Sequence, residues 1–200
     1  MSKQLGFYFD ASQCLQCYAC EVACKSVHDI GRGVRWRHVW SRWYGEFPNP
    51  ANVPISSSCH HCERPSCLSA CPTNAIVKRA EDGVVVVHRD DCIGCQACAD
   101  ACPYGAPQFG ADGRMEKCNL CVDRKQAGLE PACVATCASA ALKYGEIGTL
   151  QASASEKGGE RLAGPNKPAA VFVQGPNLAG VKADFGEFFD TSKKTLFRAS

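Results

Sequence analysis

Sixteen cysteines dominate the chemistry available to this chain of 200 residues. They fall into four groups of four, and every group contains a C-x2-C pair and ends in C-x3-C. In the most regular group, at residues 92–103, three cysteines occupy seven residues and a fourth precedes a proline. Three thiolates on such a loop can bind three irons of one 4Fe-4S cluster, while the fourth ligates a neighbouring cluster. The spacing therefore indicates iron–sulfur chemistry.

The first group repeats this spacing, and the second and fourth groups repeat it with a longer middle interval. In chain order the groups are Cys14, Cys17, Cys20 and Cys24; Cys59, Cys62, Cys67 and Cys71; Cys92, Cys95, Cys98 and Cys102; and Cys118, Cys121, Cys133 and Cys137. Pro103 suits the first turn of a helix, so we expect a helix to begin there and to turn Cys102 away from its own loop. The same crossover of the fourth cysteine is expected in every group.

A hairpin between the second and third groups indicates which groups share clusters. Residues 75–78 and 84–88 are short β-rich runs joined by a turn around Gly83. Two-cluster bacterial ferredoxins have this arrangement, so groups two and three form one module, and groups one and four remain as the other. The predicted ligand sets are Cys14, Cys17, Cys20 and Cys137; Cys24, Cys118, Cys121 and Cys133; Cys59, Cys62, Cys67 and Cys102; and Cys71, Cys92, Cys95 and Cys98.

Two other uses of cysteine compete with this interpretation. Secreted disulfide scaffolds have a similar cysteine content, but they scatter their cysteines rather than group them in fours. Zinc sites also use C-x2-C pairs, yet they combine two distant pairs and have no use for three cysteines in seven residues. We therefore favour iron–sulfur clusters over both.

Bound clusters would change the charge of the chain. If sixteen thiolates bind four cores of about +2 each, the formal net charge moves from +2 to roughly −6. The basic residues that could balance part of this charge, or simply be solvated, are Lys25, Arg64, Lys117 and Arg124. His60 and His61 lie inside the second group. Because four cysteines complete that group, we expect these histidines to tune a cluster rather than bind iron.

The segments between the groups predict short strands. Residues 6–10 and 141–147 suit strands on either side of the cysteine groups. Residues 34–40 alternate as a strand does, and the nearby Trp36, Trp40 and Trp43 could pack in the core, which we favour, or form a docking face. Prolines at positions 48, 50 and 54 then predict an extended connection.

These observations predict an α+β fold of two nested bacterial-ferredoxin-like modules with short hairpins and short helices. The double module covers residues 1–147: module A combines 5–25 with 115–147, module B spans 55–107, and 26–54 is a partner-facing insert. Residues 148–200 contain no cysteine and are expected to form an extended, partner-binding tail rather than a disordered one. The apolar residues that would contact the partner are Val171, Phe172, Val173, Phe185, Phe188 and Phe189.

The cysteine pattern resembles the four-cluster electron-transfer (β) subunit of the molybdopterin oxidoreductases, the dimethyl sulfoxide reductase family. The resemblance covers about residues 5–147 and is carried by residues 14–25, 59–67, 81–87, 92–107, 117–124 and 131–133. Since every ligand position is cysteine, it implies four 4Fe-4S clusters. It also implies two partners: a large catalytic subunit carrying Mo or W bis-molybdopterin guanine dinucleotide, and an integral membrane anchor linked to quinone.

The resemblance thus implies an electron-transfer subunit with no catalytic residues and no nucleic-acid partner. No paired carboxylates, Ser-His-Asp set or phosphate-cradling loop accompanies the cysteines. A free-standing soluble polyferredoxin is the alternative, and clusters that only brace the fold are a third. No apolar run is long enough to span a membrane, and neither a signal peptide nor a twin arginine is apparent. We expect membrane association through partners, at the periplasmic face after co-export, with the cytoplasmic face as alternative.

Overall fold

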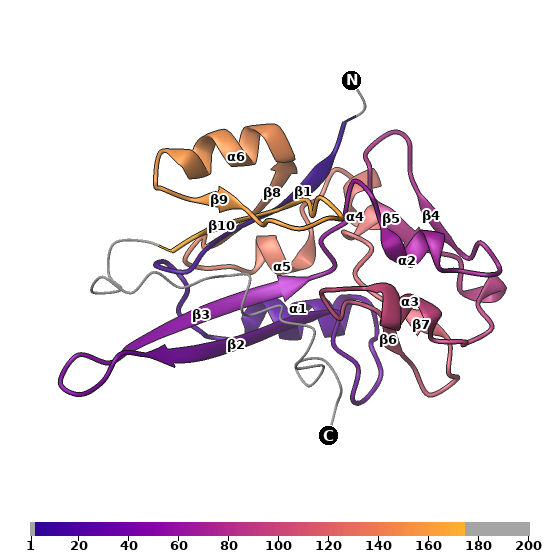
Figure 1. The fold of residues 1–200 in the computed structure, drawn as a ribbon, viewed down its shortest axis with the longest axis horizontal. Helices are drawn as coiled ribbons and strands as arrows, with labels where there is room; N and C mark the ends of the chain where they lie inside the picture. The colour runs from indigo at the N-terminus through magenta and orange to yellow at the C-terminus, as the bar shows by residue number, and fades with distance from the viewer. Residues whose placement is uncertain (1–2, 175–200) are drawn as a thin grey trace.

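The computed structural model describes residues 3–174. Within this part of the chain, short helices surround one four-stranded sheet and three two-stranded hairpins (Figure 1). The mixed α+β fold with short hairpins that the sequence predicts is therefore confirmed. No helix of residues 3–174 is long and apolar enough to cross a membrane.

The four-stranded sheet has the order β8-β1-β10-β9. Its inner strand β1 (Leu5–Asp10) pairs antiparallel with β8 (Leu142–Glu146) and parallel with β10 (Ala170–Val173). The short β9 (Glu160–Arg161) closes the edge beside β10. Every residue of β1 is buried, because the sheet is covered on both faces. The two strands predicted on either side of the cysteine groups are confirmed.

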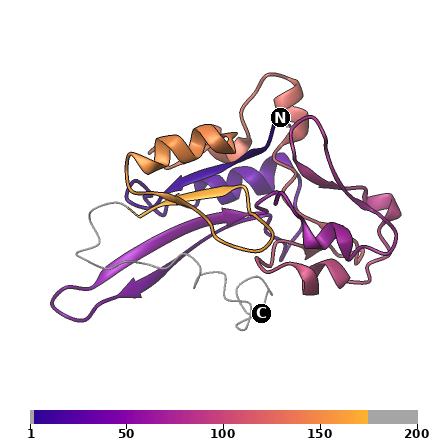
Figure 2. The same cartoon turned by 45° about the horizontal axis from the view of Figure 1, so that its top comes forward.

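Residues 148–174 are part of this core and do not form the extended tail that we expected. Helix α6 (Ile147–Ser155) lies along the sheet (Figures 1 and 2), and its Leu150 packs against Tyr8 and Val171. All four residues of β10 are buried by this chain itself, so they cannot lie on another subunit. The sequence pattern missed this strand because β10 is four residues long and pairs with a strand near the other end of the chain. The expected contacts of Phe185, Phe188 and Phe189 lie outside the described residues.

A long antiparallel hairpin projects from the body of the molecule (Figures 1 and 2). It consists of β2 (Arg37–Tyr44) and β3 (Ala51–Ser58). The predicted strand is therefore confirmed but begins three residues later than the alternation indicated. Trp36 and Trp40 pack against the main core, as expected, whereas Trp43 is 67% exposed. A docking role for Trp43 stays a prediction.

The predicted hairpin between cysteine groups two and three is also confirmed. Its strands are β4 (Ile76–Lys78) and β5 (Val85–Val87), followed by the 3-10 turn η1 (Arg89–Asp91). A smaller hairpin, of β6 (Gln108–Phe109) and β7 (Met115–Glu116), follows the third group.

The helices beside the cysteines are short, and most precede the fourth cysteine of a group. They are α1 (Ala19–Val27), α2 (Ser66–Ser69), α3 (Ala97–Ala101), α4 (Val122–Gln126) and α5 (Ala132–Ala135). Our expectation of a helix beginning at Pro103 is wrong, because α3 ends at Ala101. Cys102 has φ −87° and ψ 112°, the extended conformation that a following proline imposes on its neighbour. The proline therefore ends the helix rather than starting one.

Asp10 of β1 links this strand to Lys157, which follows helix α6. Its carboxylate is completely buried and accepts hydrogen bonds from the Ser12 hydroxyl at 2.6 Å, the Tyr8 hydroxyl at 3.3 Å and the Lys157 ammonium at 3.0 Å. Burial alone raises the pKa of Asp10, but the bonds from Ser12 and Lys157 outweigh it and lower the pKa below its usual value. The carboxylate is therefore ionised in the folded chain.

We predict that Asp10→Asn lowers the stability of the full chain by about 1.5–3 kcal/mol, the usual cost of losing hydrogen bonds to a charged group. A lowered folded pKa contributes stability above the unfolded pKa of about 3.9 and loses it only as the pH falls through the folded value. The difference in thermal midpoint between parent and variant should therefore persist unchanged from pH 8 to pH 5. Asp90→Asn, which changes a fully exposed carboxylate, is the control. Equal midpoints for parent and Asp10→Asn would contradict this account.

Candidate metal centres

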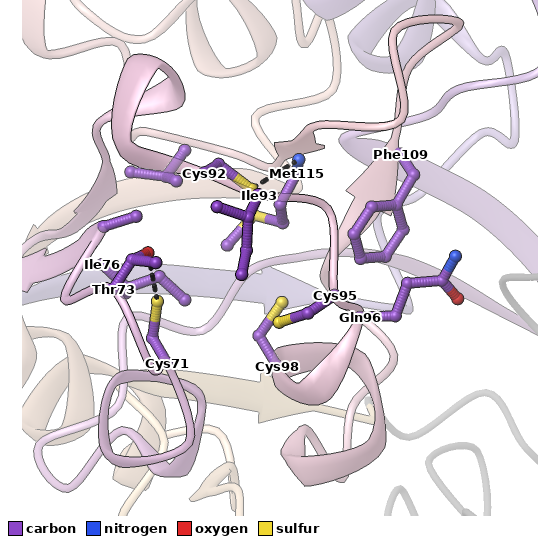
Figure 3. A pocket seen from close by; sticks show the side chains of 12 residues that line it. Cys71, Thr73, Ile76, Cys92, Ile93, Cys95, Gln96, Cys98, Phe109 and Met115 are labelled. Atoms are coloured by element: carbon purple, nitrogen blue, oxygen red, sulfur yellow. Dashed lines mark hydrogen bonds between the residues drawn. The ribbon is translucent and has the colours of Figure 1, made fainter.

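Two hollows are each lined by four cysteines of the second and third groups. The hollow in Figure 3 is lined by Cys71, Cys92, Cys95 and Cys98, and we call it site IV. The other, site III, is lined by Cys59, Cys62, Cys67 and Cys102. The two hollows are similar in size and open to solvent on one side. Each hollow combines three cysteines of one group with the last cysteine of the other, so the structure brings together two of the predicted ligand sets.

Apolar side chains form most of the remaining wall of site IV. Ile76, Ile93, Phe109 and Met115 line the hollow together with the sulfurs (Figure 3). The backbone amide of Met115 points at the Cys92 sulfur, with an N···S distance of 3.3 Å. An apolar wall with inward amides suits a buried, negatively charged iron–sulfur group, because it excludes water and still offers hydrogen bonds to sulfur.

The thiols of the two remaining predicted sets are also neighbours. We call Cys14, Cys17, Cys20 and Cys137 site I, and Cys24, Cys118, Cys121 and Cys133 site II. Burial raises the pKa of Cys14, and the three other thiols of site I add to this effect. Burial likewise raises the pKa of Cys24, and the other thiols of site II raise it further. Helix α1 packs against α5, which places the first group beside the fourth.

Electrostatic effects between thiols of different sites indicate that the four sites lie in a row. After burial, which is the main cause in each case, Cys98 of site IV raises the pKa of Cys67 in site III. Similarly, Cys59 of site III raises the pKa of Cys118 in site II. Cys133 of site II raises the pKa of Cys20 in site I. The order is therefore IV, III, II, I, with each site next to the following one.

Most of these thiols are protonated in the absence of a metal. Burial is the largest cause, and it raises the pKa of Cys98 to about 11 and those of Cys67 and Cys118 to about 12. The pKa of Cys71 shifts in the opposite direction, because hydrogen bonds from the Thr73 hydroxyl and nearby amides outweigh burial and lower it. Metal ligation by the buried thiols must therefore release protons.

Several polar groups lie within reach of the sulfurs. The Ser56 hydroxyl lies 3.5 Å from the Cys20 sulfur, and the Leu120 amide donates to the Cys118 sulfur at 3.4 Å. His28 places its Nε2 atom 3.2 Å from the Cys121 sulfur and stacks on Trp36. No local pattern could have predicted the His28 contact, because 93 residues separate the two side chains.

The two histidines of the second cysteine group are buried beside site III. His60 lines the hollow and packs edge-on against Tyr104, and burial lowers its pKa to about 3. His61 accepts a hydrogen bond at Nδ1 from the Val85 amide, and burial lowers its pKa well below the usual value. Both imidazoles are neutral, and both lie next to the cysteines that line the hollow. A tuning role for them stays a prediction.

The basic residues that we singled out lie in different environments. Lys117 is buried, lines site III, and donates to the carbonyl oxygens of Val85 and Cys118. Lys25 instead donates to two backbone carbonyls of the loop that follows α1, and Arg124 donates to the Glu130 carbonyl. The sequence analysis missed Arg37, which is only 2% exposed, since a charged residue in an alternating strand usually faces water.

Comparison with known proteins supports iron–sulfur binding by this chain. A family model described as a 4Fe-4S dicluster domain matches residues 52–147, and one for a 4Fe-4S binding domain matches residues 11–33. In Escherichia coli K12, the probable anaerobic dimethyl sulfoxide reductase chain YnfG and a second anaerobic dimethyl sulfoxide reductase chain are each 41% identical over 187 residues, covering 89% of this chain and 88% of theirs. A sulfite dehydrogenase subunit of Allochromatium vinosum is 35% identical, covering 80% of this chain and 77% of its own. The chain therefore belongs to the family of iron–sulfur subunits that includes those of the anaerobic dimethyl sulfoxide reductases.

Proposed function

We propose that this chain relays single electrons through four 4Fe-4S clusters. The electrons would pass between a quinone-linked membrane anchor subunit and a catalytic subunit that carries Mo or W bis-molybdopterin guanine dinucleotide, in a complex like dimethyl sulfoxide reductase. The observation that carries this proposal is the row of four cysteine sets, in which each set lies beside the next. A row of sites lets an electron cross the subunit in short steps.

The residues of each site fit a 4Fe-4S cluster better than a zinc ion or a disulfide. In sites III and IV, four free thiols surround a hollow. A disulfide would instead bond the sulfurs in pairs, and a single zinc ion would need all four sulfurs within bonding distance of one atom. A bound cluster supplies one-electron redox chemistry. The protein's part is to hold the irons through sulfur, to exclude water and to aim amides and hydroxyls at the sulfurs.

The two ends of the row reach the surface. Cys17 of site I and Cys95 of site IV are exposed, whereas the middle sites lie deeper. Leu15 beside Cys17 is 70% exposed, and Ile93 beside Cys95 is 67% exposed. Exposed apolar side chains next to a redox site favour docking of a partner there, because a close, dry contact shortens the electron's path. Two such ends support two partners, one at each.

The projecting β2–β3 hairpin supports a fixed complex rather than a diffusing carrier. Phe47 at its turn is 92% exposed, and Trp43 near the turn is also exposed. Aromatic side chains on a protruding arm are typical anchors of protein interfaces. We propose that this partner-facing insert holds the chain in a membrane-associated complex at the periplasmic face, reached by co-export with a signal-bearing partner.

Iron analysis tests the number of clusters. The purified full chain should contain sixteen irons, four for each of the four cysteine sets. Electron paramagnetic resonance during a redox titration should resolve four interacting clusters. About half this iron content, or a colourless product that contains zinc, would overturn the proposed function. An intact monomer that works without any large partner would instead indicate a soluble carrier.

Cysteine-to-serine variants test the crossover between groups. We predict that Cys102→Ser and Cys59→Ser alter the same cluster signal, since both residues line site III. Cys92→Ser should alter a different signal, because Cys92 lines site IV although it belongs to the same group as Cys102. Ser66→Ala, a non-cysteine residue in the wall of site III, controls for nearby changes without loss of a ligand. If Cys102→Ser and Cys92→Ser alter one common signal, the crossover is wrong.

Surface variants test the two docking ends. Val22→Lys near site I and Ile93→Lys near site IV should each leave the iron content unchanged and slow electron exchange with only one partner, by about tenfold. Leu129→Lys changes an exposed apolar residue of the fourth cysteine group and is the control. The measurement is cluster reduction by quinol and cluster oxidation by substrate in the intact complex. Equal effects of Val22→Lys and Ile93→Lys on both half-reactions would contradict separate docking ends.

A further inference from the structure

A buried arginine lies between sites I and II. Arg37 begins strand β2, and only 2% of its surface is exposed. Its Nη1 atom donates to the Ser56 hydroxyl at 3.1 Å, and its Nη2 atom donates to the Ser58 hydroxyl at 3.0 Å. Its guanidinium also lies over the Phe7 ring, 4.5 Å from the ring centre. These contacts fix the position of the charge on two sides.

The usual partner of a buried arginine is a carboxylate. Among residues 3–174, no carboxylate pairs with Arg37, and its Nε atom is buried without a hydrogen-bond partner. A buried charge is costly unless an opposite charge or a full set of hydrogen bonds compensates it. The negative charge that Arg37 needs must therefore come from a group that this fold is built to hold.

The nearby thiols identify that group. Burial alone lowers the pKa of Arg37, but the thiols of Cys133, Cys20, Cys118 and Cys24 together outweigh burial and raise it. Cys20 belongs to site I, and the other three belong to site II. Arg37 thus lies where both sites act on it at once.

Ser56 connects Arg37 directly to site I. Its hydroxyl oxygen accepts a hydrogen bond from Nη1 of Arg37, so its own proton remains free to be donated. The Cys20 sulfur lies 3.5 Å from the same oxygen and is the acceptor within reach. A hydrogen bond to a ligand sulfur stabilises negative charge on it, and this stabilisation is larger in the reduced cluster.

We propose that Arg37 is a positioning residue that raises the reduction potentials of the clusters in sites I and II by holding one permanent positive charge between them. The proposal rests on the proposed function, since it needs clusters in both sites. A 4Fe-4S core of about +2 with four thiolates carries about −2, and accepting one electron from the next site in the row makes it about −3. A fixed cation favours the more negative, reduced form. Arg37 therefore keeps two adjacent, like-charged sites reducible.

The test is a redox titration of the full-length chain in its complex, followed by electron paramagnetic resonance. Serine replacement of one cysteine in each site first assigns the signals. Arg37→Gln removes the charge, and we expect the potentials of sites I and II to fall by about 59 mV or more, a tenfold change for a one-electron couple. Sites III and IV should change less. Arg37→Lys keeps the charge and should retain potentials close to those of the parent.

Two further variants separate charge from packing. Arg32→Gln removes an exposed arginine five residues earlier and should leave all four potentials unchanged. Ser56→Ala removes only the hydroxyl beside Cys20 and should lower the potential of site I more than that of site II. A purely structural role for Arg37 would predict iron loss in both Arg37 variants and no selective change of potential.

The potentials of the Arg37→Gln variant decide whether the inference holds. If Arg37→Gln keeps sixteen irons and unchanged potentials at sites I and II, the inference is overturned while the proposed function stands. If Arg37→Gln does not assemble, Ser58→Asp takes its place, because it puts a carboxylate opposite Arg37 and cancels the charge in position. Equal potentials in Ser58→Asp and Arg37→Lys then overturn the inference. A parent chain without clusters would instead contradict the proposed function.

Discussion

The last cysteine of each group lies in a site formed mainly by another group, and this exchange organises the fold. In the proposed ligand sets, site I takes Cys137 from the fourth group, and site II takes Cys24 from the first. The sheet that joins β1 to β8 lies next to these two groups and holds them together. Because each site needs residues from two distant segments, neither segment can complete a site alone. The proposed ligand sets would therefore couple cluster binding to folding.

Burial and charge act against each other at these sites. The thiols are buried deeply enough that most would stay protonated without metal, so an apolar environment alone does not favour the thiolate. The thiolate is favoured instead by backbone amides, hydroxyl groups and two buried cations, Arg37 and Lys117. The two cations lie in different halves of the row: Arg37 is next to sites I and II, and Lys117 lines site III. The fold therefore sets which buried positive charge lies beside each site of the row.

The segment after the last cysteine strengthens the same arrangement. Helix α6 covers one face of the sheet formed by β1 and β10, and Asp10 of β1 joins the segment after this helix to the sheet through Lys157. On the other face of the sheet, Phe9 and Phe172 pack into the main core with the cysteines. The strand that precedes the first cysteine group is therefore held from both sides, which fixes where that group begins.

The sequence alone determined the iron–sulfur chemistry and the short strands, and it predicted the cysteine sets, because these depend on spacing and alternation over a few residues. The burial of Arg37, the contact of His28 with Cys121 and the packing of β10 on β1 depended on tertiary structure, since each joins residues that no local pattern relates. The prediction of a helix beginning at Pro103 was wrong for a local reason. Proline can start a helix, but it also holds the residue before it in an extended conformation. Spacing determines which atoms can bind the metal, whereas contacts between distant segments decide the charge and burial around them.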